Sequence, residues 1–102
     1  MSEITVILWR DIPAQVTCGS GRGATRAVLS ERFQEAIDAA AMVAGLSGTD
    51  GYLEEWRRDT RTVDGDDDLA VASEVEKLET EYTDDLLARL VRAQGLTPEG
   101  DT

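Results

Sequence analysis

The chain has 102 residues, the size of a single small domain, and 41% of them are apolar, which is enough to form a core. Its 21 acidic and 10 basic residues give a net charge of −11, and such a surface disfavours binding to nucleic acid or anionic lipid. The absence of histidine removes the commonest metal ligand and general base, and the single cysteine, Cys18, excludes an intrachain disulfide.

The N-terminal part of the chain predicts a small sheet. Residues 4–9 (ITVILW) are rich in β-branched side chains and predict a strand that is buried on both faces or nearly so. Residues 14–18 (AQVTC) predict a second strand, and the short connection favours an antiparallel hairpin. Residues 24–29 (ATRAVL) form either a third strand or the lead-in to a helix.

The most regular apolar pattern predicts a helix that begins after Ser30, a suitable N-cap, and ends at Gly45. One stripe at helical spacing consists of Phe33, Ala36, Ile37, Ala40, Ala41 and Ala44. The small alanine side chains would allow this helix to lie close to a neighbouring element.

Residues 47–59 predict a short helix on which Leu53 and Trp56 face inward, and residues 60–65 predict a connector. The arginines that follow Trp56 then lie on the solvent side of that helix.

The last helical segment begins in the acidic run at residues 64–68 and ends at Gly95. Its predicted apolar stripe is Leu69, Ala72, Val75, Leu78, Tyr82, Leu86 and Leu90. Because Thr83 and the two aspartates after it could cap a new helix, residues 66–94 form either one helix or two.

Together these elements predict an α+β fold, in which an N-terminal antiparallel β-hairpin or small sheet packs against three to four α-helices. We expect residues 1–95 to form one domain and residues 96–102 to be a disordered C-terminal tail.

The glycine-rich stretch at residues 18–25 (CGSGRGAT) partly fits a phosphate-binding loop, since Gly19, Gly21 and Ala24 match the dinucleotide fingerprint. The predicted helix begins several residues too late to receive a phosphate, and the Walker lysine is missing. A hairpin loop from Gly19 to Gly23 is therefore favoured over a phosphate site.

Three aspartates of the acidic run, Asp64, Asp66 and Asp68, have the spacing of the first ligands in a calcium-binding loop. The loop's required glycine is replaced by Leu69 and its final glutamate by Val75, so the run predicts an acidic helix start and no metal site. Cys18 has no histidine to activate it, and we expect it to be structural.

Two clusters of arginine, aspartate and tryptophan have the composition of an interaction surface, because Arg and Trp are frequent interface anchors. One cluster lies at the predicted turn after residue 9, and the other follows residue 55. In the alternative interpretation an Arg10–Asp11 pair braces the turn and the tryptophans lie in the core. The predicted interaction face consists of Trp9, Arg10, Asp11, Gln15, Arg32, Trp56, Arg57 and Arg58.

Residues 4–16 (ITVILWRDIPAQV) and 29–58 (LSERFQEAIDAAAMVAGLSGTDGYLEEWRR) resemble the small virulence factor domain family, which is related to the C-terminal domain of conserved virulence factor C proteins. The resemblance is carried by Trp9, Arg10, Asp11, Pro13, Gln15, Arg32, Phe33, Glu35, Leu53, Glu55, Trp56 and Arg57. It implies no established catalytic residue. It also implies an association with genes of one-carbon and corrinoid methyl transfer.

The expected function is that of a small non-enzymatic interaction or accessory protein that docks on a larger cytosolic protein and needs no cofactor. The alternative is an accessory subunit or small-ligand binder for an anionic cofactor in folate- or corrinoid-linked methyl transfer, with Arg10, Arg22 and Arg32 supplying positive charge. That alternative requires the arginines to converge on one concave pocket, whereas a docking module spreads them over a face. A homodimer through the apolar stripe of the last helix is compatible with either.

The basic residues comprise nine arginines and only one lysine, Lys77. Many carboxylates with almost no lysine keep a chain hydrated in molar salt, so the composition predicts a haloarchaeal or otherwise salt-adapted protein. The alternative source is a bacterium of high GC content, whose codons also favour arginine. We expect no signal peptide and no membrane span, and hence a cytoplasmic protein.

Overall fold

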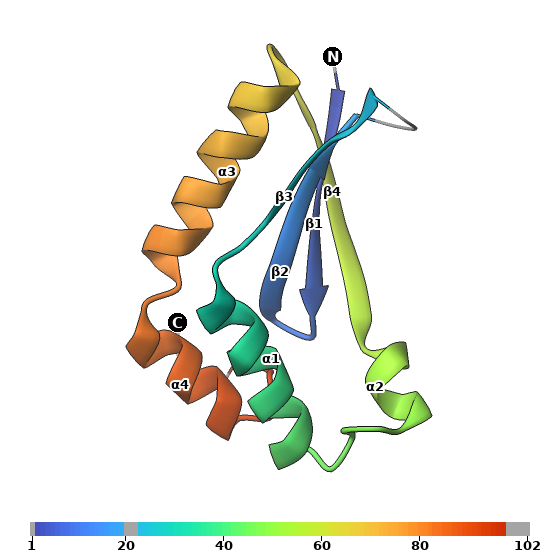
Figure 1. Ribbon diagram of the computed structural model, residues 1–102, viewed down its shortest axis with the longest axis vertical. Coiled ribbons are helices and arrows are strands. Elements are labelled where there is room, and N and C mark those ends of the chain that lie inside the picture. Colours follow the sequence, from blue (N-terminus) through green and yellow to red (C-terminus); the bar gives the residue numbers. More distant parts are fainter. Residues whose placement is uncertain (1, 20–22, 98–102) are drawn as a thin grey trace.

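The structure is a computed structural model that describes residues 2–19 and 23–97. Within these residues the chain forms a four-stranded sheet and four helices, which confirms the predicted α+β class (Figure 1). The elements in chain order are β1 (Ser2–Trp9), β2 (Ile12–Cys18), β3 (Thr25–Val28), α1 (Glu31–Val43), α2 (Asp50–Glu54), β4 (Trp56–Val63), α3 (Asp67–Glu81) and α4 (Asp84–Arg92).

The strands lie in the order β3-β2-β1-β4, and each neighbouring pair is antiparallel. β1 and β2 form the predicted hairpin, and the segment for which a strand or a helix lead-in is expected is strand β3. The pairing of β1 with β2 shifts by one residue between Ile7 and Leu8, which leaves Ala14 as a β-bulge in β2. β3 and β4 are the two edges of the sheet.

The core lies between one face of the sheet and helices α1, α3 and α4. Figure 1 shows α3 along this face, with α1 and α4 packed together beside its lower end. The sheet contributes Ile4, Val6, Val16 and Cys18, all of them buried. The predicted stripe of α1 is confirmed, since these members of it are buried: Phe33, Ala36, Ile37, Ala40 and Ala41.

The opposite face of the sheet, which we call the outer face, is only partly buried. The alternation of side chains along paired strands places the following residues on it: Thr5, Ile7, Gln15, Thr17, Arg26, Val28, Trp56, Arg58 and Thr60. Among the described elements, Figure 1 shows no helix running along this face. Of residues 4–9, Ile4 and Val6 are buried against the helices, whereas Thr5 and Ile7 on the outer face are half-buried, so the expected burial on both faces is nearly but not fully reached.

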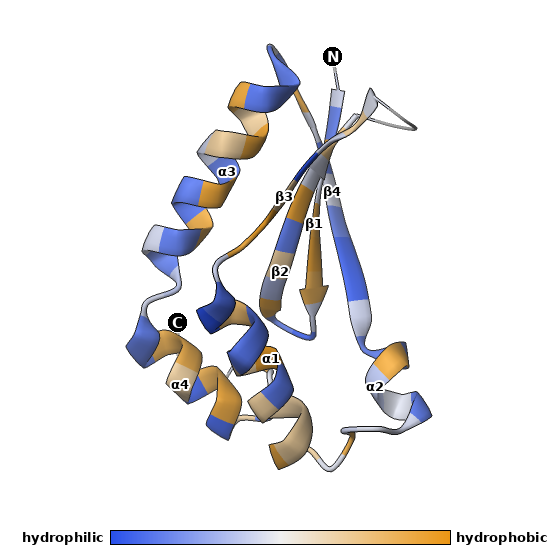
Figure 2. Ribbon diagram, viewed as in Figure 1, coloured by the Kyte–Doolittle hydropathy of each residue, from blue (hydrophilic) through white to orange (hydrophobic). Residues whose placement is uncertain are grey.

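The short helix predicted at residues 47–59 is also wrong over its second half. Helix α2 ends at Glu54, and the chain then forms the edge strand β4, which pairs with β1 along its whole length. Leu53, expected to face inward, is 66% exposed. Most of β4 is exposed and, as Figure 2 shows, hydrophilic, so it lacks the apolar alternation by which a strand is normally recognised.

The last helical segment consists of two helices, as the second of the two expectations has it. The backbone of Tyr82 leaves the helical region, and the hydroxyl of Thr83 accepts a hydrogen bond from the Leu86 amide at 3.2 Å, which caps α4. The stripe predicted for this segment is wrong at the start of α3, where Leu69 is 71% exposed, and it is confirmed at Leu78, which is buried. The buried residues of α3 are Val71, Glu74 and Leu78.

The predicted C-terminal tail begins at residue 96. The structure describes Leu96 and Thr97, and the contact of Thr97 with Asp11 is given below. The rest of that tail, residues 98–102, lies outside the described residues. Within the described ranges, no helix is both long and apolar enough to cross a membrane.

Candidate functional site

The turn between β1 and β2 is fixed by contacts of Arg10 with two distant parts of the chain. Arg10 has a φ of 54°, an uncommon conformation for a residue other than glycine. Its Nε donates to Oε1 of Glu55 at 2.7 Å, and its Nη1 donates to the carbonyl of Gln94 at 2.9 Å. The guanidinium also lies 5.2 Å from the ring centroid of Trp9. Arg10 therefore joins the turn to the residues that precede β4 and to those that follow α4.

Asp11, the next residue of the turn, binds two further groups. One carboxylate oxygen accepts a hydrogen bond from Arg57 on β4, and the other accepts from the Thr97 amide at 2.6 Å. Burial alone would raise the pKa of Asp11, but the hydrogen bonds from Thr97 and Arg57 outweigh it, so the pKa lies below its usual range. Asp11 is thus held as a carboxylate by the fold itself.

The alternative interpretation of the sequence expects Arg10 and Asp11 to pair with each other at this turn, but each of them has another partner. Arginine and aspartate do brace the turn, but Arg10 pairs with Glu55 and Asp11 pairs with Arg57. Arg57 also donates to the Arg10 carbonyl, with 3.0 Å between its Nε and that oxygen. We call Arg10, Asp11, Glu55 and Arg57 the turn network. Its charges are balanced two against two.

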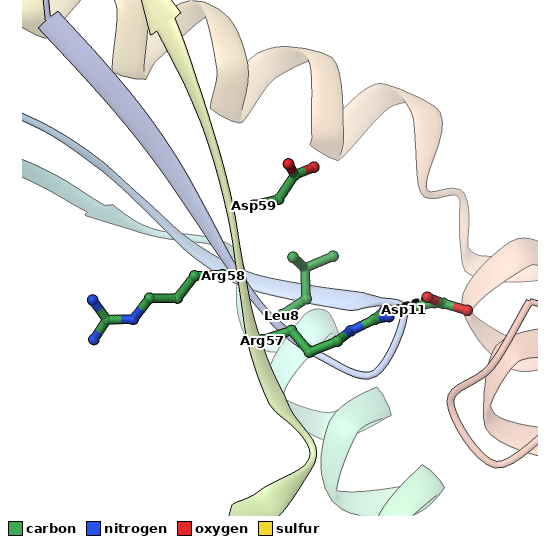
Figure 3. Close-up of a pocket in the computed structure, with 5 residues that line it drawn as sticks. All are labelled: Leu8, Asp11, Arg57, Arg58 and Asp59. Carbon is green, nitrogen blue, oxygen red and sulfur yellow. Dashed lines mark hydrogen bonds and ion pairs between the residues drawn. The ribbon is translucent and has the colours of Figure 1, made fainter.

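A hollow of about 340 Å³ lies beside the turn network and is lined by Leu8, Asp11, Arg57, Arg58 and Asp59 (Figure 3). Figure 3 shows the ion pair between Arg57 and Asp11, and it shows Arg58 and Asp59 directed to opposite sides of β4. The hollow therefore contains an internal ion pair, and one of its two arginines points away from it.

Arg32 lies apart from the turn network, where α1 begins beside the end of α3. Its guanidinium donates to the carbonyls of Tyr82 and Glu79, the latter at 2.6 Å, and to the side chains of Glu79 and Asp84. Burial would raise the pKa of Glu79, but hydrogen bonds from Ser30 and Arg32 lower it instead. Arg32 therefore fastens the start of α1 to the junction of α3 and α4.

The tryptophans belong to one aromatic cluster with Tyr52 of α2. Trp9 is fully buried, stacks on Tyr52 at 5.6 Å between ring centroids, and donates its indole N–H to the Tyr52 carbonyl at 2.9 Å. Trp56 meets the edge of the Tyr52 ring at 6.0 Å and remains partly exposed. Trp9 is thus a core residue, whereas Trp56 reaches the surface.

A second hollow of about 290 Å³ lies on the outer face of the sheet and is mostly apolar. We call it the outer hollow; it is lined by Ile7, Ala14, Gln15, Val28, Gln34 and Trp56. The strand pairing sets Val28, Gln15, Ile7 and Arg58 in one row across the sheet. Trp56 closes the hollow on the side of β4, and Gln34 closes it on the side of α1. Among the residues that the structure describes, no ionisable side chain lines it.

The structure therefore divides the predicted interaction face into three groups. Asp11 and Arg57 join Arg10 in the turn network, and Trp9 lies in the core behind it. Arg32 serves the helix junction. The residues of the predicted face that border the outer hollow are Gln15, Trp56 and Arg58.

Four lining residues of the outer hollow were not predicted from the sequence: Ile7, Ala14, Val28 and Gln34. Ile7 was not expected to line a surface hollow, because the sequence predicts that residues 4–9 are buried on both faces or nearly so. For Val28 the available signal was an apolar side chain at the end of a short strand, directly before a helix N-cap.

Other features singled out in the sequence have local roles. The aspartates of the acidic run act as predicted for a helix start, since Asp66 accepts bonds from the Asp68 and Leu69 amides at the start of α3. In the part of the chain that the structure describes, no cluster of acidic residues and cysteine has metal-binding geometry.

Cys18 is buried, and burial together with the nearby Asp67 raises its pKa, which opposes formation of a reactive thiolate. Of the glycine-rich stretch for which a hairpin loop is expected, residues 20–22 lie outside the described residues.

Comparison with known proteins identifies one family. The family model described as "Virulence factor" matches residues 7–91, which overlaps both segments that carry the resemblance seen in the sequence. No curated protein matches the chain, and no solved structure does.

Proposed function

We propose that this chain, which belongs to the virulence factor family, is a non-enzymatic interaction module that docks on a larger cytosolic protein through the outer face of its sheet. The observation that carries the proposal is the outer hollow, an apolar depression on a sheet face along which no described helix runs. Val28, at its rim, is 72% exposed. An antiparallel sheet normally has polar residues on its solvent face, so an apolar depression there indicates an interaction site.

The turn network supports this proposal indirectly. It fixes β4 against the β1–β2 turn through the bond of Arg57 to Asp11, and so places Trp56 and Arg58 beside Ile7. A site on a rigid strand presents its side chains more reproducibly than a site on a loop. The network residues are therefore assigned to building the surface, and the contact itself is assigned to the residues around the outer hollow.

The alternative of an anionic cofactor in one-carbon metabolism has less support from the geometry. Such a site needs arginines that converge with free charge, but Arg10 and Arg32 each bind carboxylates and carbonyls of the chain itself. Arg22, the third arginine of that alternative, lies outside the described residues.

The homodimer through the last apolar stripe also remains a prediction. Leu78 and Leu90, two members of that stripe, are buried inside the chain, so a dimer would need other residues.

The proposal is tested by affinity capture from the native lysate at the salt concentration of the cell, with mass spectrometry of the retained proteins. The tagged test variant is Val28→Glu/Arg58→Glu, which charges the rim of the outer hollow and reverses the neighbouring arginine. Both side chains are exposed, so the fold is expected to persist. The matched control is Leu69→Glu, because Leu69 is exposed to the same degree, at 71% against 72%, but lies on α3.

We expect one stoichiometric partner to be retained by the unmodified chain and by Leu69→Glu, and to be lost from the double variant. If the unmodified chain retains no partner, or if the double variant retains the same partner as the control, the proposal is wrong.

A further inference from the structure

The outer hollow has a size that suits one anchoring side chain. Sites that enclose small ligands typically have volumes of roughly 300–1,000 Å³. The outer hollow, at about 290 Å³, lies just below that range, and its rim residue Val28 is largely exposed. Its aliphatic and aromatic lining comes from Ile7, Ala14, Val28 and Trp56. Such a depression fits the leucine or phenylalanine side chain of a partner better than a free metabolite.

The polar groups of the outer hollow are two carboxamides that lie on different elements. Gln15 comes from β2 and Gln34 from α1, where the Gln34 amide donates to Asp38 at 3.1 Å. Each carboxamide has both donors and an acceptor. They are therefore suited to the backbone of a bound segment, whose N–H and C=O groups need partners once the segment leaves water.

Two positive charges stand on the sheet at the two ends of the apolar row. Arg58 stands next to Ile7 on β4, and Arg26 lies two residues before Val28 on β3. Both arginines are exposed, and within the described residues neither of them takes part in an ion pair. Carboxylates also stand near this face, among them Glu3 near the start of β1 and Asp38, which accepts the hydrogen bond of Gln34.

Net charge does not decide which partner fits this face. The chain carries −11 overall, but the Debye length is about 8 Å at physiological ionic strength and about 3 Å at 1 M salt. A docked segment therefore responds to the charges beside it, and the two that stand on the sheet on either side of the hollow are Arg26 and Arg58.

We propose that the segment docked on the outer face is acidic, with one large apolar side chain seated in the outer hollow and flanking carboxylates paired with Arg26 and Arg58. This inference rests on the proposed function and adds the chemistry of the partner. The occupant is a protein segment, in which leucine or phenylalanine is preceded and followed by aspartate or glutamate.

The test is a titration of the isotope-labelled chain with three short synthetic peptides whose ends are blocked, followed by two-dimensional NMR. The first has one leucine between glutamates, the second has the same leucine between lysines, and the third has serine in place of leucine between glutamates. We expect the first peptide to shift the indole signal of Trp56 and the backbone signals of Ile7 and Val28. It should bind at least about threefold more tightly than the lysine peptide and about tenfold more tightly than the serine peptide.

The same titration is repeated with Val28→Glu, which is expected to abolish the shifts, and with Leu69→Glu, which is expected to retain them. Equal binding of the glutamate and lysine peptides, or shifts confined to α3 and α4, would overturn the acidic assignment.

The sequence of the partner's contact segment distinguishes a failure of this inference from a failure of the proposed function. A partner that depends on Val28 in affinity capture, but whose contact segment carries no acidic residue, contradicts the inference and leaves the docking role standing.

Discussion

Gly95 is a residue whose importance only the structure reveals. It has a φ of 86°, its carbonyl accepts a hydrogen bond from the Asp11 amide at 2.7 Å, and a Cβ placed on it would stand 2.8 Å from the Trp9 ring. In the sequence it marks only the end of a helix. Its contact with Trp9 arises from the packing of the last helix against a turn more than eighty residues earlier.

Gly95→Ala is expected to destabilise the chain more than Gly45→Ala does. Gly45 has a similar φ of 74° but nothing within 4 Å of an added Cβ, so it reports the backbone strain alone, about 1–2 kcal/mol. At Gly95 the clash with the buried indole adds about 1–3 kcal/mol. Urea denaturation of both variants measures the difference, and equal losses would show that the ring moves aside freely.

Asp11→Asn is expected to lower the free energy of unfolding at neutral pH by about 1–3 kcal/mol, because Arg57 and the Thr97 amide lose a charged acceptor. The folded-state pKa of Asp11 is lowered, so its carboxylate contributes stability above the unfolded pKa of about 4, and this contribution is lost as pH falls through the folded pKa. The difference between the two proteins should therefore be full at pH about 7 and shrink below pH about 4.

Chemical denaturation of the unmodified chain and of the Asp11→Asn variant across this pH range measures the difference in their free energies of unfolding. A stability difference that stays constant down to pH about 2 would contradict the assignment, because protonation would then have no effect on the turn network.

At the scale of elements, α1 and the β1–β2 hairpin could be predicted because their apolar residues repeat with the period of the element that they form. β4 could not be predicted, because its sequence lacks the alternation of apolar and polar residues. In addition, Leu53 of α2 and Trp56 of β4 are three residues apart, a spacing that is typical of one helical turn. A strand of this kind is determined by its pairing with β1, a long-range contact that no local window contains. The charges on β4 also protect an exposed sheet edge from unwanted pairing.

The displaced stripe of α3 has a related cause. Glu74, a residue that composition assigns to the solvent, is buried with its side chain 6% exposed and binds Arg61 of β4. The apolar residues alone therefore predict the start of the buried face of α3 incorrectly, at Leu69. The hydrogen bond to Glu74 raises the pKa of Arg61, against the opposing effect of burial, so the guanidinium keeps its charge beside Glu74.

Arg61→Ala is expected to cost roughly 1–3 kcal/mol of stability, because it leaves a buried carboxylate without its counter-charge. The value is below the ~3–5 kcal/mol of a fully buried pair since Arg61 is half exposed. In a Glu74→Leu background the same substitution should cost little. A double-mutant cycle by urea denaturation gives the coupling, and equal costs in both backgrounds would show that the pair does not join α3 to β4.

At the scale of the whole molecule, the fold class and the family could be inferred from the sequence, and the location of the candidate surface could not. The predicted interaction residues are anchor types, and several of them bind partners in the same chain, as Arg10 does with Glu55 and Arg57 does with Asp11. Residue type says which side chains can make strong contacts. It does not say whether their partner belongs to the same chain.

The excess of carboxylates predicts a stability that increases with salt. We expect the thermal midpoint to rise between about 0.1 M and about 1 M potassium chloride, over which the Debye length falls from about 10 Å to about 3 Å and self-repulsion is screened. Chloride is used because sulfate would strengthen apolar burial by a separate effect. A midpoint that does not change with chloride would contradict adaptation to high salt.

Photo-crosslinking from single positions can establish whether the outer face of the sheet is the docking surface. A photo-reactive phenylalanine analogue is placed at Val28, on the outer face, and in a second protein at Leu69, which is equally exposed on α3. After illumination in the native cell, we expect one defined crosslinked protein from position 28 and none from position 69. A crosslink from position 69 alone, or from neither position, would contradict it.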